Sequence, residues 1–173
     1  MRSLILIIFC GFTLISCNSK KKVVYQKSIQ WISLSEVQEK MKSNPKKVLI
    51  DIYTDWCRPC KMMSRFTFTD PEVIKIINKE FYAVKFNAES KQEVDFLKKR
   101  YINKRKTHDL AIEIGSTQSG LAFPTIVYFN ESFKLIQAVP GYYEKEEFKV
   151  ILKYFGENNY KKIRYDDYYK SYY

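Results

Sequence analysis

Two cysteines separated by two residues, Cys57 and Cys60, are the residues whose types and spacing most directly indicate chemistry. Cysteine reacts as the thiolate, which can attack a disulfide of another molecule and form a mixed disulfide. A second thiol within reach then breaks that mixed disulfide and releases the partner in its reduced form. The spacing therefore predicts dithiol–disulfide exchange, with Cys57 as the nucleophile and Cys60 as the resolving thiol.

A cysteine pair of this spacing is also half of many zinc sites. A structural zinc ion needs about four protein ligands. Here the other two cysteines, Cys10 and Cys17, lie in the N-terminal segment, and His108 is the single histidine of the chain. The sequence therefore favours redox chemistry, and we expect neither a metal nor an organic cofactor.

The neighbouring elements place the pair at the start of a helix. Residues 47–54 contain an apolar, β-branched run that predicts a buried strand, and residues 61–68 are typical of a helix. At such a junction, unpaired backbone N–H groups favour negative charge on the first sulfur. We therefore expect Cys57 to be ionised and reachable, with Cys60 one turn further in.

The rest of the chain alternates between the two element types. Helices are expected over 33–43, from Asp70 onward, and over 91–101, 108–114 and 144–155, and strands over 81–86, 126–129 and 134–139. Strands that alternate with helices and end in a hairpin and a helix predict an α/β domain. Its architecture would be a central mixed β-sheet flanked by helices on both faces.

The N-terminus has the pattern of an export signal. Residues 1–16 carry one positive charge and an apolar run that is too short for a comfortable transmembrane helix. The junction L-I-S-C at 14–17 resembles the bacterial lipobox, which implies cleavage before Cys17 and lipidation of that residue. The alternative is an ordinary signal peptide that happens to contain Cys17. The lipobox implies a polar tether over 17–28 and an anchored domain in the cell envelope, facing the periplasm or the exterior.

Three segments carry a resemblance to a known family. The sequence D-I-Y-T-D-W-C-R-P-C-K spans 51–61, T-F-T-D-P-E-V spans 67–73, and F-P-T spans 123–125. Together they resemble the thioredoxin superfamily, in particular the thioredoxin-like C-terminal domain of DsbD and thioredoxin-like bacterial lipoproteins. The resemblance implies a thioredoxin-like fold for residues 29–156 and leaves 157–173 as a tyrosine-rich C-terminal extension.

The resemblance assigns two charged residues to the site. Asp51 matches the family's buried acid beneath the inner cysteine, and Lys85 matches the lysine that accompanies it. The position of Asp51 between Ile50 and Ile52 supports this role, because burial disfavours the charged carboxylate and raises its pKa. Such a group can accept the proton of Cys60. The alternatives are a solvated carboxylate at a strand edge and an ordinary surface lysine.

The resemblance also implies a substrate-binding surface beside the cysteines. Pro124 matches the family's cis-proline, and the backbone of Phe123 would pair with an extended substrate segment. Trp56 would flank the site. From the residues alone, an ordinary trans proline at a strand start is favoured for Pro124, and Trp56 could pack in the core.

The charge of the chain does not indicate a nucleic-acid partner. The formal net charge is +11, but no nucleic-acid-binding motif accompanies the basic runs at 20–22 and 103–106. We interpret them as solvated surface.

Tyrosines recur from Tyr160 to the end of the chain. They predict a helical stripe that packs on the domain, formed by Ile163, Tyr165, Tyr168, Tyr169 and Tyr172. The alternative is an aromatic binding surface.

Three functions remain open from the sequence. The leading hypothesis is a membrane-tethered disulfide reductase that acts on exported proteins and receives electrons from a membrane donor of the DsbD/CcdA type. The second is a non-catalytic binding module of thioredoxin fold, whose cysteines form a passive disulfide. The third is a disulfide isomerase or oxidase, because sequence alone does not fix the direction of electron flow.

Overall fold

The computed structural model describes residues 26–172. The predicted signal peptide 1–16, the lipidation site Cys17 and most of the tether lie outside these residues. Within residues 26–172, no helix combines the length and the apolar character needed to cross a bilayer.

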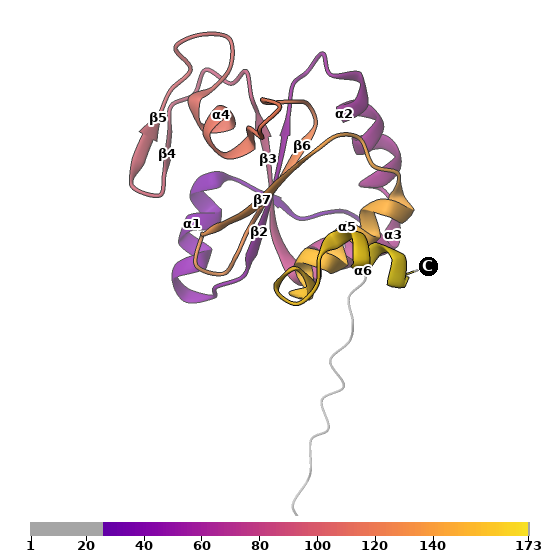
Figure 1. The fold of residues 1–173 in the computed structure, drawn as a ribbon. Coiled ribbons are helices and arrows are strands. Elements are labelled where there is room, and N and C mark those ends of the chain that lie inside the picture. Colours follow the sequence, from indigo (N-terminus) through magenta and orange to yellow (C-terminus); the bar gives the residue numbers. More distant parts are fainter. Residues whose placement is uncertain (1–25, 173) are drawn as a thin grey trace, which may run out of the picture.

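A five-stranded mixed sheet forms the centre of the domain (Figure 1). The spatial order is β1-β3-β2-β6-β7, in which β1, β3 and β2 run parallel and β6 and β7 are antiparallel to their neighbours. The strands are β1 (Trp31–Ile32), β2 (Lys47–Tyr53), β3 (Phe81–Asn87), β6 (Thr125–Phe129) and β7 (Leu135–Pro140).

Helices cover both faces of this sheet, which confirms the predicted thioredoxin-like architecture (Figure 1). α1 and α4 cover one face, and α2, α3 and α5 cover the other. Their bounds are α1 (Leu34–Ser43), α2 (Arg58–Met62), α3 (Pro71–Glu80), α4 (Asp109–Gly115) and α5 (Lys145–Gly156).

The central strand β2 directs a carboxylate into one of the two cores. Side chains alternate across a strand, so Ile50 and Ile52 join the core beneath α1 and α4, whereas Leu49 joins the core beneath α3 and α5. Asp51 is on the same face as Leu49 and is buried. An ionisable group is therefore built into the apolar face that α2 begins to cover.

Side-chain caps begin three helices close to the starts that the sequence predicts. Ser33 and Glu36 make a reciprocal capping box at the start of α1. Asp70 accepts hydrogen bonds from the backbone N–H groups of Glu72 and Val73 at the start of α3. His108 begins α4, where its Nδ1 accepts from the Leu110 N–H at 3.2 Å. These bonds satisfy orphan donors at the helix N-termini.

The helix after the cysteines is not regular throughout. α2 continues directly into a π-helical turn, Met63–Thr67, so the predicted helix over 61–68 is present with an altered hydrogen-bond pattern. The Thr67 hydroxyl donates to the Tyr143 carbonyl at 2.7 Å. This bond ties the far end of the turn to the loop before α5.

The prediction of a helix over 91–101 is wrong, because this segment forms a hairpin of β4 (Val94–Phe96) and β5 (Lys99–Tyr101). Its two-residue turn has positive φ at both Leu97 and Lys98, the geometry that suits a tight hairpin. Phe96 and Tyr101 are buried in the core beneath α1 and α4. Tertiary burial of these two rings outweighs the helical propensity of the intervening charged residues.

The C-terminal extension packs against the domain. It forms a short 3₁₀ turn and then α6 (Tyr165–Tyr172). The rings of Tyr165 and Tyr168 lie 5.2 and 5.3 Å from the ring of Tyr154, whose hydroxyl donates to the Ile163 carbonyl. Packing is therefore confirmed for Tyr165 and Tyr168. Ile163, Tyr169 and Tyr172 are exposed, although the Tyr172 hydroxyl accepts a hydrogen bond from Lys153 of α5.

Truncation measures what this extension contributes to stability. A chain that stops at Gly156 loses the three half-buried rings of Tyr160, Tyr165 and Tyr168 and uncovers Tyr154, so we expect its free energy of unfolding to fall by about 2–4 kcal/mol. Urea denaturation measures this value. Lys170→Ala, on the exposed side of α6, should stay within about 0.5 kcal/mol of the parent. Equal stability of the truncated and full chains would contradict the packing role.

Candidate active site

The two cysteines form a disulfide at the junction of β2 and α2. Cys57 immediately precedes α2 and Cys60 lies in its first turn, with their Cα atoms 5.3 Å apart. The Cys57 Sγ accepts the Cys60 backbone N–H at 3.1 Å. The sequence prediction of a strand–helix junction is confirmed, and the structure describes the oxidised state of the pair.

Access to this disulfide is restricted. Cys57 is 2% exposed and Cys60 is 4% exposed. The expectation that the first sulfur is reachable is therefore not met in the oxidised state. Arg58 and Pro59, which lie between the two cysteines, are exposed and form the surface that an approaching partner meets.

The buried Asp51 and the half-buried Lys85 form an ion pair on the face of the sheet that α2 covers. The two residues lie opposite each other in the β2–β3 register, and Asp51 Oδ2 is 3.5 Å from Lys85 Nζ. Burial raises the pKa of Asp51 to about 6, and the neighbouring Lys85 offsets only part of this effect. The predicted burial and the predicted juxtaposition are both present.

Lys85 is held by groups that the sequence argument did not identify. Its ammonium donates to Ser64 Oγ at 2.9 Å, closer than its contact with Asp51. It also lies 5.0–5.7 Å from the ring centres of Tyr53, Trp31 and Phe68. Aromatic faces attract cations at such distances, so the cage fixes the charge beside the carboxylate.

The spacing of Ser64 and Tyr53 in the sequence is enough to predict that both lie near the site. Ser64 follows Cys60 by four residues, which places it one helical turn further on, in the π turn that continues α2. Tyr53 follows Asp51 by two residues, which places it on the same face of β2. Trp31 and Phe68 reach Lys85 only through the tertiary fold.

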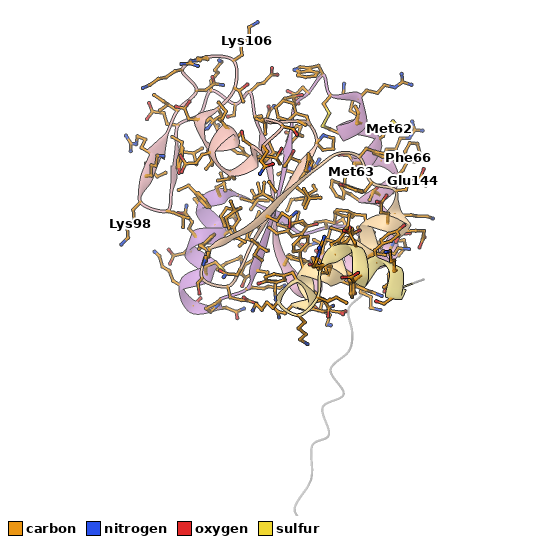
Figure 2. The ribbon with its side chains drawn as sticks, viewed as in Figure 1. Met62, Met63, Phe66, Lys98, Lys106 and Glu144 are labelled. Carbon is orange, nitrogen blue, oxygen red and sulfur yellow. A yellow bond between two sulfur atoms is a disulfide. The ribbon has the colours of Figure 1, made fainter. Side chains whose placement is uncertain are left out.

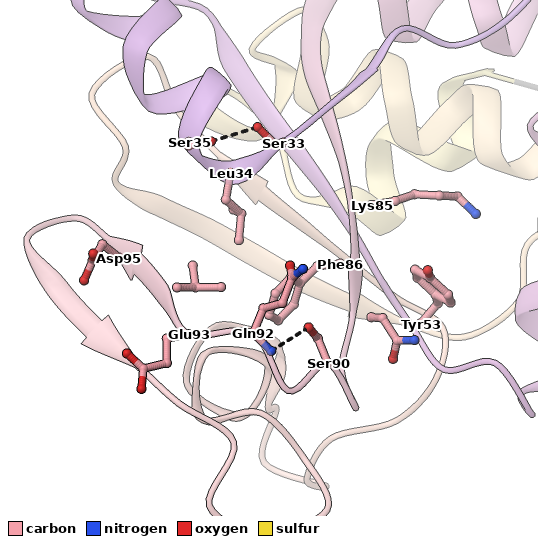
Figure 3. A pocket seen from close by; sticks show the side chains of 12 residues that line it. Ser33, Leu34, Ser35, Tyr53, Lys85, Phe86, Ser90, Gln92, Glu93 and Asp95 are labelled. Atoms are coloured by element: carbon pink, nitrogen blue, oxygen red, sulfur yellow. Dashed lines mark hydrogen bonds between the residues drawn. The ribbon is translucent and has the colours of Figure 1, made fainter.

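A cavity of about 320 Å³, here named the Cys60 hollow, opens beside the inner cysteine. It is lined by Tyr53, Thr54, Asp55, Cys60, Lys61, Ser64, Arg65 and Lys85. Tyr53 and Lys85 also line a larger pocket of about 480 Å³ at the edge of β3. In Figure 3 these two residues lie at one side of that pocket, and the acids Glu93 and Asp95 lie at the other.

The predicted substrate-binding residues come together next to the pair. Trp56 is 66% exposed, and its ring meets that of Phe123 edge-on at 6.0 Å. Its indole N–H donates to Glu89 at 3.0 Å. The Phe123–Pro124 peptide bond is cis, as predicted. Trp56 therefore contributes surface at the site, and the core-packing alternative is excluded.

Other candidate groups lie apart from this constellation or play supporting parts. His108 is fully buried as the cap of α4, with its Nε2 3.0 Å from the Gln92 carbonyl oxygen. Asp55 is exposed and accepts a hydrogen bond from the Asn87 amide. In the described part of the chain, no three His, Cys, Asp or Glu side chains gather as metal ligands would.

The ion pair predicts how the carboxyl group responds when the lysine is removed. In Lys85→Gln, the pKa of Asp51 should rise above its value of about 6, because the charge that offsets burial is lost. NMR titration of the Asp51 carboxyl carbon measures this. Lys40→Gln, an exposed cation on α1, serves as the control and should leave the titration unchanged. A pKa that stays the same or falls in Lys85→Gln would contradict this assignment.

The raised pKa also predicts a pH dependence of stability. Between an ordinary value of 3.8 and about 6, folded Asp51 retains a proton that the unfolded chain has lost. The contribution of Asp51 to the free energy of unfolding, measured as the difference between the parent and Asp51→Asn, should therefore fall as pH rises from 4 to 7, by about 2–3 kcal/mol at ~1.4 kcal/mol per pH unit.

Asp51→Asn should remove this decrease and be more stable than the parent at pH 7. Urea denaturation of the disulfide form at a series of pH values checks both statements. Parallel pH profiles for the parent and the variant would show that Asp51 titrates normally.

Comparison with known proteins agrees with this geometry. A family model described as a thioredoxin-like domain matches residues 34–156. The thiol:disulfide interchange protein DsbD of Actinobacillus pleuropneumoniae is 34% identical over 120 residues, which cover 67% of this chain and 18% of DsbD. This chain therefore spans less than a fifth of the length of that relative.

Solved structures show the same fold. A thioredoxin-fold protein from Helicobacter pylori has a TM-score of 0.57 at 23% identity, covering 74% of this chain and 80% of that protein. A putative disulphide-isomerase from Bacteroides thetaiotaomicron has a TM-score of 0.53 at 22% identity, covering 75% and 94%. With the fold, the cysteine pair and the family match in agreement, the chain belongs to the thioredoxin-like domain family and is related to DsbD.

Proposed function

We propose that this chain is a thiol–disulfide oxidoreductase that reduces disulfides of exported proteins through Cys57 and Cys60. One observation supports this most strongly. A C-x-x-C disulfide at the start of α2 shares the Cys60 hollow with Lys85, the partner of a buried carboxyl group whose pKa is about 6. A passive disulfide in a binding module has no need of a buried proton acceptor.

The reaction begins from the dithiol. The Cys57 thiolate attacks one sulfur of the substrate disulfide, which forms a mixed disulfide and expels the other substrate sulfur as a thiolate. The Cys60 thiol then loses its proton and attacks the Cys57 sulfur. The substrate leaves as a dithiol, two electrons richer, and the Cys57–Cys60 disulfide of this structure remains.

Asp51 is suited to receive the proton of Cys60. A carboxyl group with a pKa of about 6 is mostly ionised at neutral pH, yet it is a far better base than an exposed carboxylate. Lys85, at 3.5 Å, stabilises the ionised form between turnovers. Asp51 would return the proton as the next cycle begins.

Each turnover consumes two electrons, so the oxidised pair must be reduced again by a dithiol. We assign this task to a membrane donor of the DsbD/CcdA type, because DsbD relatives are named for thiol:disulfide interchange. A lipid anchor at Cys17 and the tether at 17–28 would hold the domain in the cell envelope near such a donor. Fatty-acid labelling that is lost in Cys17→Ala tests the anchor.

Substitution of the cysteines tests the chemistry. Cys57→Ser should abolish insulin reduction, because the first bond to substrate is never made. Cys60→Ala should retain attack but fail to resolve it, so that mixed disulfides with envelope proteins accumulate and appear on non-reducing gels. Insulin reduction that persists in Cys57→Ser would overturn the proposed function.

The reduction potential of the pair tests the direction. For a reductase we expect a value near the approximately −270 mV of thioredoxin and well below the approximately −120 mV of DsbA. Equilibration with glutathione buffers, followed by alkylation of free thiols, measures it. A value near that of DsbA would instead favour the oxidase.

A further inference from the structure

All charged residues of α2 and of the π turn that follows it are basic. Arg58, Lys61 and Arg65 are exposed, and their spacing places them along one side of the helix. No acidic residue occurs between Arg58 and Phe68. This is an unusual concentration of one sign of charge directly after the reactive cysteines.

These three cations are not neutralised within the domain. Among residues 26–172, none of them lies within 4.0 Å of a carboxylate, whereas Lys85 and Lys149 both have such partners. Their positive charge is therefore directed to whatever approaches from solvent.

Two of the cations also line the Cys60 hollow. Lys61 and Arg65 contribute two positive charges to its wall, beside Lys85, which is paired with Asp51, and the wall itself carries the single carboxylate of Asp55. Asp55 already accepts a hydrogen bond from the Asn87 amide. The space beside the inner sulfur is thus suited to an anionic group, because a concave surface lined by one sign of charge focuses its field.

Apolar side chains adjoin the cations. Met62 is 37% exposed and Phe66 is 54% exposed, and Figure 2 shows both at the outer edge of the helix. The Arg65 guanidinium lies over the Phe66 ring at 5.3 Å. Large apolar side chains beside arginine are the composition typical of protein-binding surfaces.

We propose that Arg58, Lys61, Met62, Arg65 and Phe66, here named the α2 face, form a docking surface for an acidic segment of the redox partner. The proposal rests on the proposed function and specifies its partner. Aspartate or glutamate side chains near the partner's cysteines would pair with Lys61 and Arg65. A neighbouring apolar side chain of the partner would cover Met62 and Phe66.

Charge complementarity is the reason for this choice of partner. A basic segment would place like charges against three exposed cations of a chain that already carries a formal net charge of +11. An acidic segment is attracted before contact, and opposite charges accelerate encounter more than they strengthen the final complex. Preference for acidic substrates should therefore appear in the rate of attack and weaken with salt.

Two synthetic peptides test the proposal. Each carries one intramolecular disulfide and one leucine, and they differ only in having two glutamates or two lysines beside the cysteines. The pre-reduced full chain should reduce the glutamate peptide about three- to tenfold faster at low ionic strength. The ratio should approach one at about 0.5 M salt. Acid quenching and chromatography give the rates.

A pair of matched variants locates the effect. Lys61→Glu/Arg65→Glu should reverse the preference. Lys98→Glu/Lys106→Glu changes the net charge equally at exposed sites remote from the α2 face and should preserve the preference (Figure 2). Loss of the preference in both double variants would show an effect of overall charge and overturn the docking surface. Lys61→Gln/Arg65→Gln, which should remove the preference, repeats the test without introducing acids.

A second pair tests the apolar part. Phe66→Ser should slow reduction of the leucine-containing peptide more than that of a version with serine in place of leucine. Leu135→Ser, an exposed apolar residue on β7, should affect both peptides equally. Equal effects of Phe66→Ser on both peptides would exclude Phe66 from the surface.

The outcomes separate the two proposals. If the parent reduces both charged peptides equally, or prefers lysine, the exchange activity stands and the α2 face is not an acid-docking surface. If it reduces neither peptide nor insulin, the proposed function fails and the docking surface fails with it.

Discussion

The burial of one carboxyl group, Asp51, is the constraint on which the site depends. An isolated ionised carboxylate is very unfavourable in an apolar core, so it must be paired or protonated. The parallel register of β2 and β3 supplies the pairing by setting Lys85 opposite Asp51. Ser64 and three aromatic rings then hold the ammonium in place. Lys85 offsets only part of the effect of burial, so the pKa of Asp51 remains raised, at about 6.

The two sides of α2 carry different kinds of groups beside the cysteines. The side that faces the sheet lies towards Lys85, the ion-pair partner of Asp51, and the side that faces solvent carries exposed apolar groups and cations that have no carboxylate partner among residues 26–172. Trp56 and Phe123 add a further surface where the loops after β2 and before β6 meet. In the proposed mechanism, proton transfer would take place at Asp51 inside the domain, and partner recognition would use exposed groups that do not contact the Asp51–Lys85 pair.

Features set by neighbours in the chain were predictable from the sequence. The strand before Cys57, the caps at Ser33 and Asp70 and the raised pKa of Asp51 follow from local patterns and from burial. The cis bond at Pro124 was expected only through family resemblance. The hairpin over 94–101 and the contacts of Trp31 and Phe68 with Lys85 depend on rings brought together by the fold, which no local pattern predicts.

The chain enters the fold at the end of the sheet opposite the disulfide. The Ser28 carbonyl accepts a hydrogen bond from the Asn78 amide, and the Lys46 ammonium donates to the Asn78 carbonyl just before β2 begins. The disulfide follows the opposite end of that seven-residue strand, about 20 Å away. The described chain thus enters the domain at the pole opposite the cysteines, which leaves the disulfide end free of the polypeptide that precedes the fold.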